Sequence, residues 1–180
     1  MIDSFMKNIY KAFWLGIFIP ILISCSIFRN LENIDLSNVF LDPNQKYAGL
    51  SVNKAFHYDP DNFYYSSAFR IMNQDIVTTE GNKAGGITIY LINSPRKRKE
   101  EYNFLSYMES QEGVIPYEYP PITDDSIFFT TDRAIIFNFI RCEVLVSTYI
   151  ERRGKDSADA ERLWSIANLI DANLENYVCE

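Results

Sequence analysis

The strongest alternation of hydrophobic and polar positions lies in the last third of the chain. Residues 126–131 and 134–150 are rich in β-branched and aromatic side chains, and the polar pair Asp132-Arg133 separates them. This pattern predicts two strands joined by a tight turn. We expect one face of the second strand to be turned toward the core. That face carries Ala134, Ile136, Ile140, Cys142, Val144, Val146 and Ile150, with Asn138 and Thr148 as polar exceptions.

A change of period after Gly154 predicts a helix at the end of the chain. From there the apolar residues recur at steps of three and four, as they do on one side of an α-helix. These residues are Ala160, Leu163, Ala167, Ile170, Leu174 and Tyr177. Asp156 or Ser157 is a suitable N-cap, and we expect the helix to cover the sheet.

Three further extended segments come earlier in the chain, at residues 50–58, 63–73 and 87–92. Their content of Val, Ile, Tyr and Phe and their flanking turn residues predict strands. A helix of about fourteen residues is predicted after the third strand, with Ser94 as its N-cap and Pro95 at its first position, where a missing N–H costs nothing.

The expected elements follow one another as strand, strand, strand, helix, strand, strand, helix. Their short connections favour antiparallel neighbours. We therefore predict a single α+β domain in residues 34–180, with a mainly antiparallel sheet of about five strands and two helices, the C-terminal helix being packed on the sheet.

An apolar run from Ala12 to Ile23 precedes this domain and follows the basic residues Lys7 and Lys11. A helix that spans a bilayer needs about 18 to 20 apolar residues, so this run is too short. Its length and its basic flank are typical of the hydrophobic region of a signal peptide.

The run ends in Leu22-Ile23-Ser24-Cys25, which resembles the bacterial lipobox. The resemblance implies cleavage before Cys25, attachment of a diacylglycerol to its sulfur and acylation of the new amino group. Two or three acyl chains, at about 0.8 kcal/mol per buried CH₂, anchor a protein stably. Residues 1–24 would then be a lipoprotein signal peptide, and residues 25–33 a lipidated N-terminus and short tether. The implied location is the cell membrane or outer membrane, with the domain facing the periplasm or the exterior.

The charge of the chain argues against one class of partner. The formal net charge is −7, and residues 1–24 contain one acidic and two basic residues, so their removal changes it to −8. An acidic domain gains nothing from the counterion release that drives nucleic-acid binding, and we expect no nucleic-acid partner. The expected partners are the lipid bilayer, through the acylated Cys25, and an envelope protein complex.

The sequence contains no motif typical of an enzyme. His57 is the single histidine, and GxSxG, HExxH and CxxC are absent, so we predict no enzyme, no cofactor and no metal centre. The acidic clusters 42–44 and 59–62 lack EF-hand spacing and predict turns. A carboxylate-based hydrolase is a remote alternative, and its candidate residues are Glu100, Glu101, Glu118, Asp124 and Asp125.

Residues 111–125 hold four Pro or Gly residues around Tyr117 and Tyr119 and are predicted to be irregular. Loops longer than a dozen residues are uncommon in compact domains and are often functional. The two tyrosines are candidate ligand-binding residues, in a platform for a sugar or a peptide. The alternative is that they pin the loop to the core.

Four basic residues, Arg96 to Lys99, begin the first predicted helix, where they oppose the helix dipole. One interpretation is that they contact anionic lipid headgroups near the anchor, at about 1 kcal/mol per residue. The other is that they form a solvated helix face, with Glu100 and Glu101 as partial counterions.

Residues 87–177, in which a long strand leads through a glycine turn into a terminal amphipathic helix, loosely resemble small extracytoplasmic domains of the PsbP and Mog1-like kind. The resemblance implies that the domain binds a partner or a ligand rather than catalyses a reaction. We therefore expect a binding or accessory module of the cell envelope, with a small-ligand or sugar-binding lipoprotein that uses loop 111–125 as the alternative.

Cys142 and Cys179 are the two cysteines that remain if lipid consumes Cys25. The eight residues from Cys142 to Ile150 span about 26 Å as a strand, and the eighteen residues of the following helix return about 27 Å. An antiparallel helix would bring Cys179 back over Cys142. We predict a disulfide between them, which requires Cα atoms within about 7 Å; two free thiols are the alternative.

The lipobox generates a direct prediction about Cys25. Because its sulfur is the acyl acceptor, Cys25→Ser is expected to abolish incorporation of radiolabelled palmitate, and to release the protein from membranes or leave it uncleaved. Labelling and fractionation of the expressed variant measure both effects. A variant that labels and fractionates as the wild type does would contradict the lipoprotein interpretation.

Overall fold

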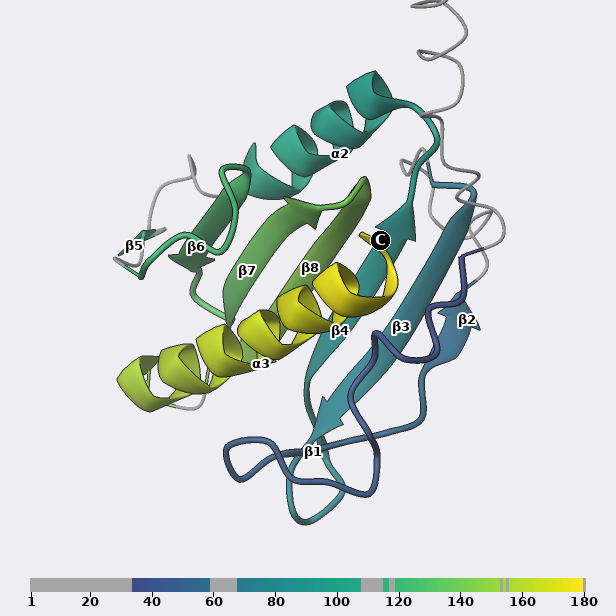
Figure 1. The fold of residues 1–180 in the computed structure, drawn as a ribbon. Coiled ribbons are helices and arrows are strands. Elements are labelled where there is room, and N and C mark those ends of the chain that lie inside the picture. The colour runs from purple at the N-terminus through teal and green to yellow at the C-terminus, as the bar shows by residue number, and fades with distance from the viewer. Residues whose placement is uncertain are drawn as a thin grey trace, which may run out of the picture. The chain divides into compact units, whose positions relative to one another are not determined.

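The computed structural model describes residues 34–58, 68–107, 115–116, 119–152, 154 and 156–179, which all belong to one unit that begins at Ile34. Within these residues an antiparallel sheet of eight strands has the order β1-β3-β4-β8-β7-β6-β5, and β2 also pairs with β3 (Figure 1). The long strands are β3 (Arg70–Val77), β4 (Lys83–Leu91), β6 (Ser126–Thr130), β7 (Ala134–Arg141) and β8 (Val144–Glu151). The short strands are β1 (Ser51–Val52), β2 (Phe56–Tyr58) and β5 (Ile115–Pro116).

Two helices lie on opposite faces of this sheet. The C-terminal helix α3 (Asp156–Tyr177) crosses one face and contacts β7 and β8 (Figure 1). Helix α2 (Pro95–Tyr107) contacts the same two strands from the other face, where Tyr102 packs with Ile71, Tyr90 and Leu145. The predicted α+β class, with two helices and the C-terminal one packed on the sheet, is confirmed.

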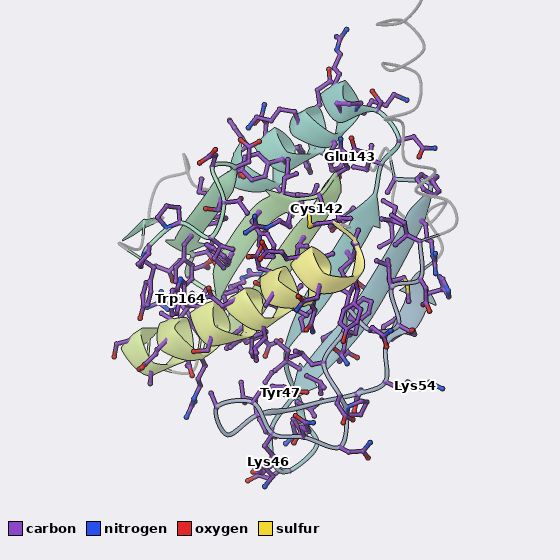
Figure 2. The ribbon with its side chains drawn as sticks, in the orientation of Figure 1. Lys46, Tyr47, Lys54, Cys142, Glu143 and Trp164 are labelled. Carbon is purple, nitrogen blue, oxygen red and sulfur yellow. A yellow bond between two sulfur atoms is a disulfide. The ribbon has the colours of Figure 1, made fainter. Side chains whose placement is uncertain are left out.

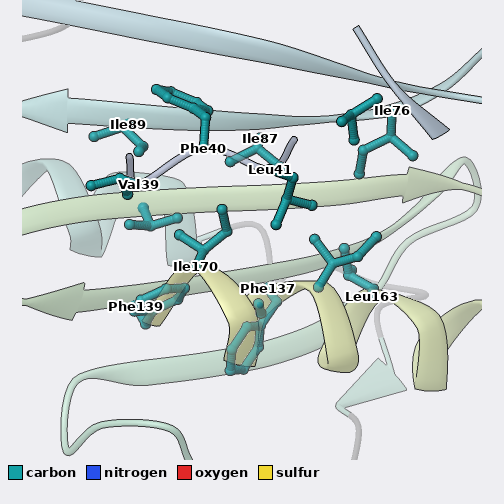
Figure 3. Close-up of a cluster of buried hydrophobic side chains, with 14 of the residues drawn as sticks. Val39, Phe40, Leu41, Ile76, Ile87, Ile89, Phe137, Phe139, Leu163 and Ile170 are labelled. Atoms are coloured by element: carbon teal, nitrogen blue, oxygen red, sulfur yellow. The ribbon is translucent and has the colours of Figure 1, made fainter. Parts of the chain in front are cut away.

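The main core lies between the sheet and helix α3. Buried aliphatic residues of α3, such as Leu163 and Ile170, pack against Phe137, Phe139 and the inward residues of β3, β4 and β8 (Figure 3). Side chains from an irregular N-terminal segment complete this layer. They are Leu36, Val39, Phe40, Leu41 and Leu50.

One buried amide holds this irregular segment in place. Gln74, which is 1% exposed on β3, accepts a hydrogen bond from Leu41 N at 3.0 Å and donates to Leu41 O at 2.7 Å and Asn53 O at 2.9 Å. From α3, Asn173 donates to Val39 O at 3.1 Å. The segment therefore needs no helix or strand of its own, because side chains satisfy its buried backbone groups.

The predicted single strand 134–150 is wrong. The chain reverses at Cys142-Glu143, so that β7 and β8 form a hairpin in which Arg141 pairs with Val144. Cys142 and Glu143 have φ values of 50° and 69°. Positive φ at both central residues matches the right-handed twist of a two-residue hairpin. Cys and Glu are not typical of such a turn, so the sequence pattern does not predict it.

The turn also reverses the predicted core face of β7. Because residues 141 and 144 face each other across the turn, the inward positions are odd-numbered in β7 and even-numbered in β8. Ile135, Phe137 and Phe139 therefore enter the main core, whereas Ile140 packs on the α2 side. The expected core face is right for β8 and wrong for β7.

Other predictions about strand bounds, exposed helix residues and turns are partly right. The predicted strand 50–58 is two short strands, and the strand predicted at 63–73 continues to Val77, with residues 63–67 lying outside the described part. In α3, Tyr177 is 56% exposed and Val178 is buried instead. Other expectations are confirmed: Ser94 Oγ accepts from Lys97 N at 3.4 Å at the start of α2, and the Asp42 carboxylate accepts from Asn44 N at 2.9 Å in a turn.

The Cys142-Glu143 turn is tied to both helices (Figure 2). The predicted Cys142–Cys179 disulfide is present, with the Cα atoms 5.2 Å apart, and it joins the turn to the end of α3. From α2, the buried Arg98 donates to the carbonyl oxygen of Glu143. Burial lowers the pKa of this guanidinium, and the Glu143 carboxylate opposes that effect.

Beside the turn, Arg141 forms two hydrogen bonds of 2.6 Å with the Asp171 carboxylate on α3. The Asp171 carboxylate raises the pKa of Arg141, and burial opposes this shift. Bidentate pairs fix orientation as well as distance. The C-terminal half of α3 is thus held to the hairpin by a covalent bond and an ion pair.

Relief of the positive φ at Glu143 is predicted to stabilise the domain. A left-handed conformation costs a non-glycine residue about 1–2 kcal/mol, part of which glycine loses again as chain entropy. We expect Glu143→Gly to be about 0.5–1 kcal/mol more stable than Glu143→Ala, since both lose the carboxylate and both keep the carbonyl that Arg98 binds. Urea unfolding of the two variants measures the difference, and a less stable glycine variant would contradict the argument.

Loss of the disulfide is predicted to be costly. It closes a separation of 37 residues, for which the chain-entropy relation gives about 3–4 kcal/mol. We expect Cys142→Ala/Cys179→Ala to lose about this much unfolding free energy. Dithiothreitol is expected to destabilise the wild type similarly and to leave the double variant unchanged. Equal stability of wild type and double variant in oxidising buffer would contradict this prediction.

Candidate functional site

A pocket of about 230 Å³ lies over β2, β3, β4 and β8. Its lining side chains belong to the sheet face opposite α3, as the pairing of the strands shows. The lining residues are Phe56, Asn73, Gln74, Asp75, Lys83, Gly86, Ile87, Thr88 and Tyr149. Gln74 and Ile87 take part through their backbone, because their side chains point into the main core.

The position of the pocket follows from the rows of paired residues across the sheet. Helix α2 covers the apolar row formed by Ile71, Tyr90, Leu145 and Ile140. The next two rows toward the other end of these strands are more polar. They are Asn73, Thr88 and Ser147, then Asp75, Gly86 and Tyr149. The pocket is therefore built where the sheet continues beyond the apolar contact with α2.

Gly86 makes room for the Tyr149 ring, with which it is paired across the strands. A Cβ at position 86 would lie 3.0 Å from Tyr149 Cε1 and 3.6 Å from its Cζ and Oη. The ring therefore reaches across β4 and covers the backbone at the glycine. This arrangement places an aromatic wall inside the pocket, with Phe56, which is 42% exposed, on the β2 side.

An ion pair lies at one side of the pocket. Lys83 Nζ is 2.6 Å from Asp75 Oδ1, and both side chains are partly accessible. The hydrogen bond to Asp75 raises the pKa of the Lys83 ammonium, burial opposes the shift, and Tyr149 adds a smaller rise. Lys83 therefore stays charged and is unsuited to act as a base or nucleophile near neutral pH.

The polar side of the pocket ends at Thr88, which hydrogen bonds the Tyr90 hydroxyl. Burial, followed by the charge of Glu101, raises the pKa of Tyr90 to about 12. The phenol therefore remains neutral and keeps its hydrogen bond with Thr88, which lines the pocket. The pocket lining thus combines polar groups with two aromatic rings, which suits it to bind a small molecule. These groups are the Lys83–Asp75 ion pair, the Asn73 amide, the Thr88 hydroxyl and the rings of Phe56 and Tyr149.

The sequence patterns do not single out Gly86, Asp75 or Tyr149 as functional residues. The sequence feature that could have indicated the pocket is the set of polar residues on one face of the central strands. These residues form a site only because the strand register places Asp75, Gly86 and Tyr149 side by side.

The two tyrosines predicted for ligand binding have different outcomes. Tyr117 lies outside the described residues. Tyr119 is half-buried, with its ring centroid 5.1 Å from that of Phe128 and 5.7 Å from that of Trp164. Trp164 Nε1 also donates to Pro120 O at 3.3 Å. These contacts are those expected of a residue that pins the loop to the core.

Of the candidate hydrolase carboxylates that the structure describes, two are bound by basic residues of α2 and one is buried. Glu100 binds Arg96 at 2.9 Å, Asp125 binds Lys99, and Glu101 is buried under α2. Asp124 is exposed, and Glu118 lies outside the described residues. His57 is an exposed residue of β2, opposite Met72 on the neighbouring strand.

The basic start of α2 is largely engaged by the protein itself. Besides the pairs of Arg96 and Lys99, the Lys99 ammonium lies 4.6 Å from the centroid of the Tyr102 ring, and Arg98 is buried at the hairpin turn. Lys97 is exposed. Contact of this helix with anionic lipid stays a prediction.

Cys25 and the lipobox lie outside the described residues. Among the helices that are described, none is long and apolar enough to cross a membrane. The described residues also contain no group of three or more His, Cys, Asp or Glu side chains placed to hold a metal ion.

Comparison with known proteins gives no relative from which a function can be transferred. No protein-family model matches the chain, and no curated protein and no solved structure is significantly similar to it. The function is therefore inferred from the chain's own residues.

Proposed function

We propose that this protein is a lipid-anchored, extracytoplasmic binding module of the cell envelope that holds a small ligand in the sheet pocket. The observation that carries the proposal is the pocket itself, in which Tyr149 and the Lys83–Asp75 pair converge on one cavity. Binding sites combine apolar walls with a few convergent polar groups. Asp75 and Lys83 hold each other as an ion pair, and the raised pKa of Lys83 makes this ammonium unsuited to act as a base.

The extracytoplasmic location is supported from two sides. The lipobox at Leu22-Ile23-Ser24-Cys25 supports export and lipidation. The Cys142–Cys179 disulfide supports an oxidising compartment, because such bonds persist outside the cytosol and are rare within it.

Exposed aromatic residues on α2 favour a second candidate function, that of an accessory subunit in an envelope protein complex. Phe104 and Tyr107 are 58% and 63% exposed. Exposed aromatic side chains are frequent anchors of protein interfaces. In that case α2, rather than the pocket, would be the functional surface.

Two measurements test the proposed function. Protease treatment of spheroplasts is expected to digest the lipidated protein, because its domain lies outside the cytoplasm. Native mass spectrometry of the detergent-purified full chain, mixed with a low-molecular-mass envelope extract of the producing organism, is expected to detect a one-to-one small-molecule adduct. Asn73→Phe, which fills the pocket with a residue that strands accept, is expected to abolish the adduct.

The matched control is Glu161→Phe, which adds the same ring to the exposed side of α3, across the sheet from the pocket. It is expected to keep the adduct. Protection from protease would overturn the location. The absence of an adduct in the wild type, or its survival in Asn73→Phe, would overturn the binding function and leave the accessory role on α2.

A further inference from the structure

We infer that the ligand of the pocket is a neutral sugar ring, a single hexopyranose unit either free or at the end of a glycan. The inference rests on the proposed binding function and adds the class of ligand. It follows from the size of the pocket, the charge of its lining and the placement of its aromatic and polar groups.

The volume limits the ligand to a small molecule. The pocket encloses about 230 Å³, whereas sites for drug-sized molecules begin at about 300 Å³. One six-membered ring with its substituents fits this space. A nucleotide or a lipid chain exceeds it.

The lining charge excludes a strong preference for an ion. Asp75 and Lys83 are the only charged residues among those that line the pocket, and they neutralise each other at 2.6 Å. An anion or a cation would have to compete with this pair and would leave one partner uncompensated. A neutral ligand with several hydroxyls can instead donate to the Asp75 carboxylate and accept from the Lys83 ammonium while the pair stays intact.

The aromatic wall suits the apolar face of a sugar. The Tyr149 ring reaches across Gly86 and lines the pocket beside these charges. The C–H groups on one side of a pyranose ring carry partial positive charge and match the negative face of an aromatic ring. Asn73 and Thr88, which are paired across β3 and β4, provide an amide and a hydroxyl for the hydroxyls at the ring edge.

Ligand-observed saturation-transfer NMR tests the inference on the full lipidated chain, in a detergent without a sugar headgroup. The probes are methyl β-D-glucopyranoside, methyl β-D-galactopyranoside and N-acetyl-D-glucosamine. Choline as a cation, inorganic phosphate as an anion and L-alanine as a zwitterion serve as smaller charged probes, and L-alanine tests whether a ligand with both charges binds the Asp75–Lys83 pair. Saturable binding in the millimolar range is expected for at least one sugar, and none is expected for the charged probes.

Matched variants locate the binding. Tyr149→Phe keeps the ring and is expected to retain affinity within about threefold, whereas Tyr149→Ala is expected to lose about tenfold. Asp75→Asn is expected to lose about tenfold, and Asp132→Asn, which removes an exposed carboxylate of a turn elsewhere, to lose nothing. Thr88→Val, of similar shape, provides a second polar variant if Asp75→Asn does not fold, and circular dichroism checks each.

The inference is overturned if no sugar binds the wild type, if sugar binding survives both Tyr149→Ala and a folded polar variant, or if a charged probe binds in the pocket more tightly than every sugar. A pocket-dependent adduct from the envelope extract together with no sugar binding would overturn the sugar class alone. Loss of both signals would overturn the proposed function as well.

Discussion

The two-residue turn at Cys142-Glu143 is the constraint on which the rest of the fold depends. Both residues hold a left-handed conformation that is unfavourable for their side chains, and contacts from both faces of the sheet maintain it. The disulfide and the Arg141–Asp171 pair attach α3 on one side, and Arg98 attaches α2 on the other. Because the turn sets the alignment of β7 and β8, it also decides which residues of β7 enter the core.

The same anchoring determines where a ligand can bind. Helix α2 is fixed by Arg98 at the hairpin end of the sheet, and its apolar contacts include the row that contains Tyr90 and Leu145. The rows beyond it present Thr88, Asp75 and Tyr149 to the pocket. The central strands can carry polar side chains on this face because α2 covers only part of it and leaves the remaining rows accessible. The pocket and the position of α2 are two results of one constraint.

Some predictions were right for reasons that differ from the argument that produced them. The disulfide was predicted from matching lengths of strand and helix, whereas β8 has 8 residues, about 26 Å, and α3 has 22, about 33 Å. Cys142 and Cys179 nevertheless meet beyond the end of α3. The core face of β7 was wrong because a turn with Cys and Glu at positive φ carries none of the Asn-Gly signal typical of such hairpins. One undetected turn was enough to reverse every side chain of a strand.

The sequence by itself determined the α+β class, the two helices and the Ser94 cap, because periodicity and capping act over a few neighbouring residues. It made the pairing of Cys142 with Cys179 an expectation, which the fold then confirmed. Only the tertiary structure decided the hairpin register, the role of Gln74 in holding the irregular segment 34–50, and the pocket. Asp75, Gly86 and Tyr149 become neighbours through pairing between three strands that lie far apart in the chain. Local patterns carry no information about such pairing, since it depends on which of many alternative alignments buries the most apolar surface at once.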